Sequence, residues 1–114
     1  MQYALMIYAE PGRVETLSDA ERLAARAEFS ALADGSRITG DVELQSAETA
    51  TCVRVAGGRT LMTDGPFADT KEVLGGFVLI EAANLDGATL AARIAADRVG
   101  GVVEVRPVVE VVTR

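Results

Sequence analysis

The chain of 114 residues contains no histidine and no tryptophan, and Cys52 is its single cysteine. Histidine is the side chain most often used for proton transfer near neutral pH and is the commonest metal ligand, so acid–base chemistry here is left to carboxylates, lysine or tyrosine. One cysteine excludes an internal disulfide and a cysteine-based zinc site. Phosphate-loop and dinucleotide-binding glycine motifs are also missing. We therefore expect no metal and no cofactor.

Positive charge is scarce as well. The sequence has 11 basic and 17 acidic residues, a net charge of −6, and no basic cluster. Nucleic-acid binding depends on clustered Lys and Arg, so we expect no nucleic-acid partner. The apolar run at residues 3–9 is too short to span a bilayer, and the N-terminus lacks the pattern of a signal peptide. The composition thus predicts a cytoplasmic protein with no membrane partner.

The length predicts a single domain over residues 1–114 with one core. Apolar runs bounded by turn residues predict the strands, and the central Gly57-Gly58 pair indicates a hairpin. The predicted strands are residues 3–9, 51–55, 60–63, 76–81 and 102–106, with a weaker extended segment at 38–44. The runs at 3–9 and 77–80 are apolar on both faces, which is typical of strands buried on both sides.

Two helices are predicted between these strands. Ser18 and Glu21 form a capping box that starts a helix reaching about Ala33, with Gly35 as its stop. Asn84 caps a second helix that extends to about Ala96 and ends before Gly100-Gly101. The residues expected to face the core are Ala25, Phe29 and Leu32 in the first helix and Leu85, Ala88, Ala92 and Ala95 in the second.

The order β-α-β-β-β-α-β predicts an α+β fold, namely a ferredoxin-like sandwich with both helices on one face of an antiparallel sheet. Such a sheet has its other face bare, although the strands at 3–9 and 77–80 are apolar on both sides. A large bare apolar face on a soluble protein is a contact surface. We therefore expect a homodimer in which two sheets close face to face about a two-fold axis.

Residues 64–72, Asp-Gly-Pro-Phe-Ala-Asp-Thr-Lys-Glu, form the most distinctive stretch of the sequence. Pro66 fixes its own φ, restricts Gly65, and has no N–H, so Asp64 cannot form the usual side-chain bond to the residue two places on. Two interpretations remain for Asp64. Its carboxylate accepts the N–H of Phe67, or it serves a pocket as a base or ligand acceptor.

This stretch, together with Leu-Gly-Gly-Phe-Val-Leu-Ile at 74–80 and Val-Glu-Val-Arg-Pro at 103–107, resembles the YCII-related family, in its DGPF-domain branch. The resemblance covers nearly the whole chain. It implies a ferredoxin-like fold that forms a dimeric α/β barrel, in agreement with the two-sided strands. It does not imply one activity, because a related branch uses a His–Asp pair and this chain has no histidine. The resemblance also implies a link to extracytoplasmic-function sigma factors, whose genes often lie beside those of the DGPF type.

The remaining candidate site residues are charged or aromatic. Asp64 and Glu72 are the candidate catalytic residues, and Phe67, Lys71, Glu104 and Arg106 are the candidate ligand-binding residues. Lys71 suits an anionic group and Glu72 a proton transfer, although both also suit an exposed ion pair. Glu104 and Arg106 lie two apart on one strand and share a face, where they would line a barrel interior or form a structural ion pair.

Two functions are compatible with these residues. The first is binding of a small polar or anionic molecule in a dimeric barrel, with cofactorless chemistry of the lyase or isomerase type. The alternative is a non-catalytic regulatory or accessory partner of a sigma-factor-type transcription regulator. A cleft that gathers Asp64, Glu72 and Arg106 would favour the first function. A filled barrel interior would favour the second function or a purely structural role.

Overall fold

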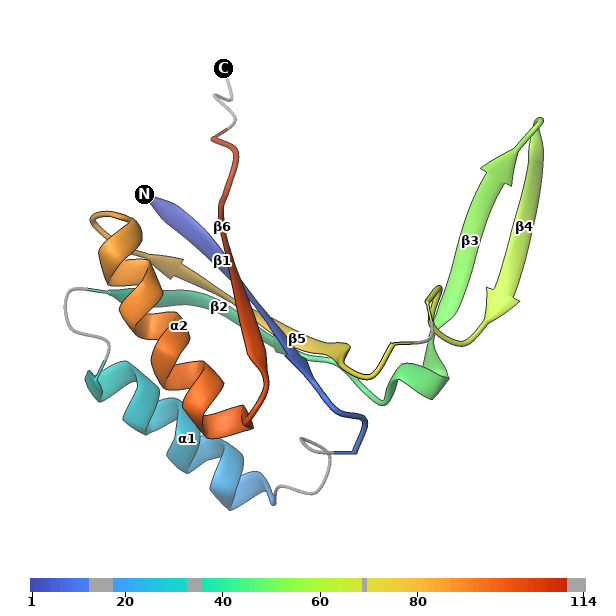
Figure 1. Cartoon of the computed structure of the whole chain (residues 1–114). Coiled ribbons are helices and arrows are strands. Elements are labelled where there is room, and N and C mark those ends of the chain that lie inside the picture. Colours follow the sequence, from blue (N-terminus) through green and yellow to red (C-terminus); the bar gives the residue numbers. More distant parts are fainter. Residues whose placement is uncertain (13–17, 33–35, 69, 111–114) are drawn as a thin grey trace.

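The computed structural model describes residues 1–12, 18–32, 36–68 and 70–110 (Figure 1). Its elements in chain order are β1 (Gln2–Ala9), α1 (Asp19–Leu32), β2 (Arg37–Glu43), the 3-10 turn η1 (Ala47–Thr49), β3 (Thr51–Ala56), β4 (Arg59–Asp64), β5 (Val73–Glu81), α2 (Leu85–Val99) and β6 (Val102–Pro107). Within these residues, one antiparallel sheet has the order β2-β5-β1-β6, and β3 and β4 form a separate two-stranded sheet. This α+β arrangement fits a ferredoxin-like fold.

The segment predicted as weakly extended is the full edge strand β2 of the main sheet, so one more strand separates the helices than the predicted order contains. The strand is hard to recognise because it places polar residues toward α1. Asp41 accepts from Nε of Arg26 at 2.7 Å, and Glu43 lies 3.2 Å from Nε of Arg22. A register shift between Ile38 and Gly40 further breaks its alternation.

Both helices begin where the sequence predicts. The Glu21 N–H donates to Oγ of Ser18 at 3.2 Å, and the Ser18 N–H lies 3.5 Å from Oε1 of Glu21, which confirms the capping box. The Gly87 N–H donates to the side chain of Asn84 at 3.0 Å. Helix α2 runs to Val99, about one turn beyond the prediction, and ends at Gly100 in the left-handed conformation. The predicted stop at Gly35 lies outside the described residues.

The core forms between the sheet and α2. Its buried members are Tyr3, Leu5, Ile80, Ala82, Ala88, Ala91, Ala92 and Ala95. The predicted inward positions Ala88, Ala92 and Ala95 are confirmed, whereas the prediction for Leu85 is wrong because this first helical residue is 54% exposed. The predicted core positions Ala25, Phe29 and Leu32 lie outside the residues whose side chains the structure describes.

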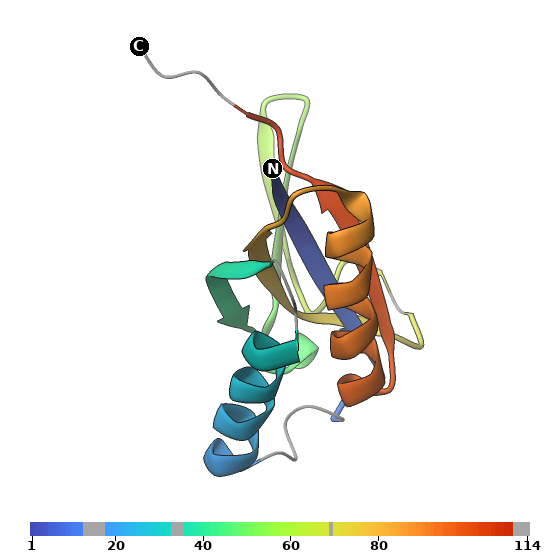
Figure 2. The same ribbon diagram turned by 90° about the vertical axis from the view of Figure 1, so that its left-hand side faces the viewer.

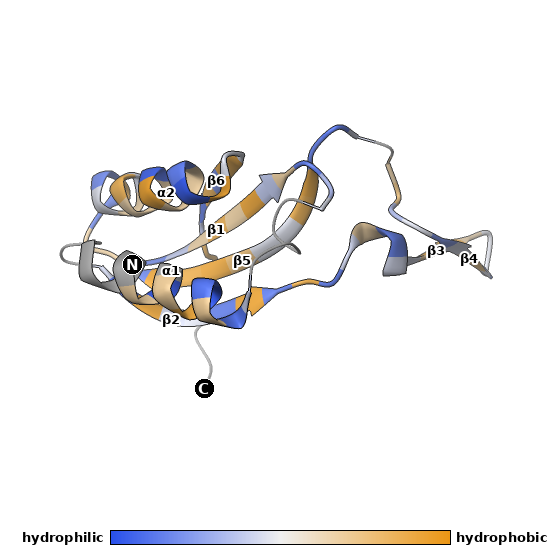
Figure 3. Ribbon diagram, turned by 90° about the horizontal axis from the view of Figure 1, so that it is seen from below, coloured by the Kyte–Doolittle hydropathy of each residue, from blue (hydrophilic) through white to orange (hydrophobic). Residues whose placement is uncertain are grey.

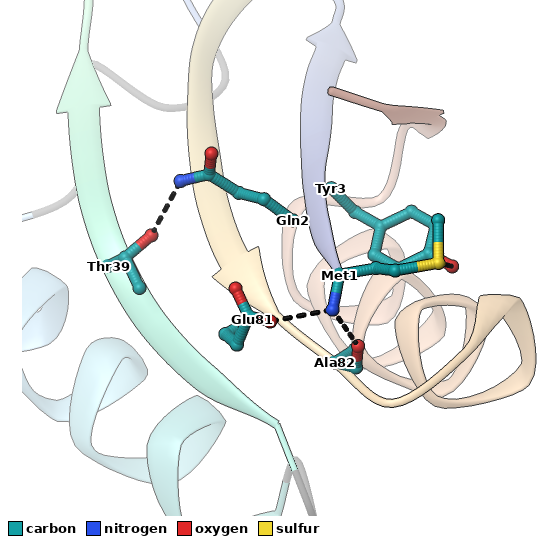
Figure 4. Close-up of polar contacts among 6 residues, drawn as sticks. All are labelled: Met1, Gln2, Tyr3, Thr39, Glu81 and Ala82. Atoms are coloured by element: carbon teal, nitrogen blue, oxygen red, sulfur yellow. Dashed lines mark hydrogen bonds and ion pairs between the residues drawn. The ribbon is translucent and has the colours of Figure 1, made fainter. Parts of the chain in front are cut away.

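Strand β1 is tied to its neighbours at its first residues (Figure 4). The N-terminal amine of Met1 lies 2.6 Å from Oε1 of Glu81 and donates to the Ala82 carbonyl at 3.0 Å. Gln2 reaches across β5 and donates to Oγ1 of Thr39 at 3.3 Å. These contacts fix the alignment of β1, β5 and β2 at this end of the sheet.

The sheet has one covered and one open face. Both helices lie on the same side of it (Figures 1 and 2), with α2 packed over Tyr3, Leu5 and Ile80. Helix α1 contacts β2 through Arg22 and Arg26. The alternate side chains of β1 and β5 point to the other side. We call this side the open face, and the register assigns to it Ala4, Met6, Tyr8, Leu74, Phe77 and Leu79 from the central strands, Val42 from β2, and Val102, Glu104 and Arg106 from β6. In the described part of the chain, no element covers it.

Strands β3 and β4 project away from the main sheet as a hairpin arm, residues 51–64 (Figures 1 and 3). The two-residue turn has φ of 57° at Gly57 and 75° at Gly58, which confirms the predicted hairpin. The Cα radius of gyration is 16.0 Å, whereas a globular chain of this length has about 13 Å. The projecting arm accounts for the larger value.

Close packing of β5 against β2 requires glycine at position 76, since a Cβ there would collide with the Val42 carbonyl oxygen. We predict that Gly76→Ala lowers the free energy of unfolding by about 1–3 kcal/mol, the usual cost of overpacking, in urea denaturation monitored by circular dichroism. The matched control is Gly75→Ala, whose added methyl group would meet only the Ile7 carbonyl at ordinary contact distance. Equal losses in the two variants would contradict this explanation.

Candidate functional site

A hollow of about 610 Å³ lies beside the 64–72 stretch, at one end of the main sheet. The end of β1, the start of β5, the η1 segment and the loop that follows the arm form its walls. Its polar lining residues are Tyr8, Gln45, Ser46, Thr49, Thr70 and Glu72, and its apolar ones include Leu44, Pro66, Phe67, Val73 and Leu74. Because Tyr8 and Leu74 also belong to the open face, the hollow borders that face.

Short-range hydrogen bonds shape the η1 wall. Oγ of Ser46 accepts from the Glu48 N–H at 3.5 Å, and Oγ1 of Thr49 donates to the Ser46 carbonyl at 2.7 Å. The Ala50 N–H donates to the Ala47 carbonyl at 3.1 Å. The Leu44 N–H donates to the Gly75 carbonyl at 2.9 Å and ties this wall to β5. Ser46 and Thr49 are held by backbone contacts and present their side chains near the hollow.

The Asp64-Gly65-Pro66 turn closes the base of the arm. The Gly65 N–H donates to the Ala50 carbonyl at 2.7 Å, and Sγ of Cys52 donates to the Gly65 carbonyl at 3.2 Å. Gly65 has φ of 90°, a conformation that glycine adopts without strain and that agrees with the restriction expected from Pro66. The turn therefore fixes where the arm leaves the domain.

Asp64 lies at the end of β4 opposite Thr51, and its side chain is exposed. Among the described residues, its carboxylate accepts no hydrogen bond from Phe67 and forms no ion pair, so the local cap is not formed. Asp64 also does not line the hollow. A catalytic role for Asp64 stays a prediction. It would require a second chain or a ligand to supply the groups that Asp64 acts on.

Phe67 and Glu72 are the two sequence-predicted site residues that the structure brings together, both in the wall of the hollow. Phe67 is 84% exposed, and Glu72 is half-buried. The carbonyl of Glu72 accepts from Oγ1 of Thr70 at 2.6 Å, which holds the loop. Among the described residues that line the hollow, Glu72 is the one charged side chain, and none is Lys or Arg. The hollow is therefore suited to ligands that donate hydrogen bonds.

The other predicted site residues lie elsewhere. Lys71 is largely exposed and is 3.6 Å from Oε1 of Glu10. Glu104 and Arg106 form a 3.8 Å ion pair along β6 on the open face. Within one chain, Asp64, Glu72 and Arg106 are therefore not gathered in a common cleft.

Sequence reasoning missed the contribution of Tyr8, Ser46 and Thr49 to the hollow. The η1 segment has no apolar periodicity, and its one local signal is Ser46 placed as a cap two residues before Glu48. Tyr3 and Tyr8 lie five residues apart on β1 and point to opposite faces of the sheet, so only Tyr8 lies beside the hollow.

Comparison with known proteins identifies the family. The model of the YCII-related domain matches residues 1–112 of the chain. The protein belongs to the YCII-related family. It is also 33% identical to an uncharacterized protein of Rhizobium meliloti (strain 1021) over 92 residues, which cover 77% of this chain and 74% of the relative. No helix among the described residues of this YCII-related protein is long and apolar enough to cross a membrane.

The exposed position of Asp64 leads to a stability prediction. Asp64→Asn should change the free energy of unfolding by less than about 0.5 kcal/mol, because the described chain provides no bond that the substitution would remove. Chemical denaturation would measure the change. Ser18→Ala, which removes a bonded helix cap, should lose about 0.5–2 kcal/mol and serves as the reference. A comparable loss in Asp64→Asn would contradict the prediction and reveal a partner from outside the single chain.

Proposed function

We propose that this protein is a homodimer of the DGPF-domain type in which two open faces pack together as a dimeric α/β barrel. The observation that supports the dimer is the apolar centre of the open face, formed by Ala4, Met6, Phe77 and Leu79, which are partly exposed in the described chain. Contiguous apolar surface of this kind marks a contact site, and a two-fold axis brings the same surface from both subunits together.

The charges on the open face are compatible with this pairing. Glu104 and Arg106 lie on the edge strand β6, with the apolar centre beside them on β1. In a face-to-face dimer their charged groups flank the apolar centre along one edge and become available to the opposite subunit. A polar rim around an apolar centre is the usual composition of a protein interface.

We further propose that the hollow binds a small polar molecule, with Glu72 as the acceptor and Phe67 as an aromatic wall. The volume of 610 Å³ falls in the range of small-molecule sites, about 300–1,000 Å³. The observation that carries this proposal is the half-buried carboxylate of Glu72 in a lining whose described residues contain no cation. It favours a ligand with an amino or hydroxyl group over an anion.

A cofactorless lyase or isomerase reaction would use the same geometry. In an isomerisation Glu72 would take a proton from one atom of the bound molecule and return it to another, while the Tyr8 phenol in the same hollow donates a hydrogen bond to the bound molecule. In a lyase reaction the electron pair of the broken bond would leave with the departing group, and Glu72 would pass the proton to that group. The second candidate function is a regulatory role through a protein partner. The exposed apolar arm is the observation that favours it.

The dimer proposal predicts the mass of the protein in solution. Sedimentation equilibrium at micromolar concentration should give about 24 kDa, twice the 11.9 kDa of one chain. Phe77→Glu should shift the protein toward the monomer because it places a charge in the centre of the interface. Leu90→Glu, an equivalent change on the exposed surface of α2, should leave the mass at that of the dimer. A wild-type monomer would refute the proposal.

The ligand proposal predicts which compounds bind and which substitution weakens their binding. Thermal-shift screening should find that small amines and polyols stabilise the protein more than carboxylates and phosphates of similar size. For the best compound, Glu72→Gln should weaken binding by roughly tenfold or more in calorimetric titration, because a charge-assisted hydrogen bond contributes about 1.5–3 kcal/mol. Lys71→Gln, beside it but outside the hollow, should bind like the wild type. Preferential binding of anions would contradict the assignment.

A further inference from the structure

The arm exposes an unusual amount of apolar side chain for a free-standing hairpin. Val53, Val55 and Met62 are 62%, 70% and 69% exposed, and Leu61 is 50% exposed. In the described structure, the arm is hydrogen-bonded to the rest of the chain at its base, where Sγ of Cys52 donates to the Gly65 carbonyl and the flanking Gly65 N–H donates to the Ala50 carbonyl. An isolated two-stranded hairpin is marginally stable in water. The arm therefore needs a surface that covers it.

The two faces of the arm differ. The register places Val53, Val55 and Met62 on one face, which we call the outer face of the arm, together with Thr51, Thr60 and Asp64. Cys52, Arg54 and Leu61 point to the opposite face, where a second hollow is also lined by Val53 and by Pro66 and Phe67 of the following loop. The following loop thus flanks part of the opposite face, and the outer face carries the more exposed apolar side chains of the arm.

The net charge of the arm is compatible with a second copy of the chain as the partner. Residues 51–64 contain Arg54 and Arg59 against one carboxylate, Asp64. The rest of the chain contains nine basic and sixteen acidic residues, so a weakly basic arm projects from an acidic domain. The register places both arginines on the face opposite Val53, Val55 and Met62, so this charge attracts the arm as a whole to an acidic domain but does not select the face that makes contact.

The position of the arm points to the same partner. Its base adjoins the hollow, and the hollow borders the open face through Tyr8 and Leu74. A copy packed on the open face would therefore lie beside the arm. Six residues of each strand give the arm a reach of about 20 Å. One partner can cover the open face and the arm at once.

We propose that the arm of each subunit lies across its partner, with the outer face formed by Val53, Val55 and Met62 buried against the partner's domain. This inference rests on the dimer proposed above. It adds a specific contact that a dimer held by the sheets alone would lack. In such a dimer two symmetric arms clasp the two domains, and the Asp64-Gly65-Pro66 turn sets the direction of each arm.

The test compares two neighbouring residues of β4 that point to opposite faces. The photoreactive residue p-benzoylphenylalanine replaces Met62 in one variant and Leu61 in the other, and each protein is irradiated as a purified full-length chain. The Met62 variant should give a covalent dimer on a denaturing gel, with at least about fivefold more product than the Leu61 variant, because position 62 lies against the partner. Sedimentation confirms beforehand that each variant is dimeric.

A second pair of variants measures the contribution of the contact. Met62→Asp should raise the dimer dissociation constant about tenfold or more, and Leu61→Asp should change it less than about threefold. The inference is overturned if positions 61 and 62 give equal yields of cross-linked dimer and equal changes in the dissociation constant. It is also overturned if neither position cross-links or changes the dissociation constant in a protein that sediments as a dimer. In both cases the dimer formed by the sheets alone would remain. A wild-type monomer would overturn both.

Discussion

The two central strands of the main sheet are apolar on both faces, and in the described structure α1 and α2 lie on only one of them. Because side chains alternate along a strand, burying one half of the apolar side chains of β1 and β5 under the helices places the other half on the opposite face of the sheet. Leu5 and Ile80 are buried against the helix layer, while Met6, Phe77 and Leu79 remain on the open face. The proposed dimer, and the proposed contact of the arm with a second copy, both depend on this constraint.

Local patterns predicted much of the fold. The capping box at Ser18, the cap at Asn84 and the Gly57-Gly58 turn each depend on a few neighbouring residues, so the sequence alone identifies them. Strand β2 was underestimated because Asp41 and Glu43 face α1 and satisfy arginines that are distant in sequence. The separation of the hairpin from the main sheet is also a long-range result that turn signals do not determine.

The candidate site was predicted less completely. Phe67 and Glu72 line the hollow, whereas Lys71, adjacent to Glu72, points away from it toward Glu10. Adjacency in a loop does not determine side-chain direction, so the motif could not separate these residues. The Asp64-Gly65-Pro66 turn has a structural explanation that the sequence suggested in part: its backbone closes the base of the arm and places Phe67 beside the hollow. The other walls of the hollow, which include η1 and Tyr8, come from segments distant in sequence, so their position beside Glu72 could be identified only in the folded structure.

Hydrogen exchange in the arm tests most directly whether a second copy covers the surfaces that one chain leaves bare. The measurement compares amide exchange in residues 53–62 between the wild type and the monomer-forming Phe77→Glu variant, by mass spectrometry. Coverage by a partner predicts slow exchange of these amides in the wild type and at least about tenfold faster exchange in the variant, because a lone hairpin opens readily. Equally fast exchange in a dimeric wild type and in the variant would contradict the account.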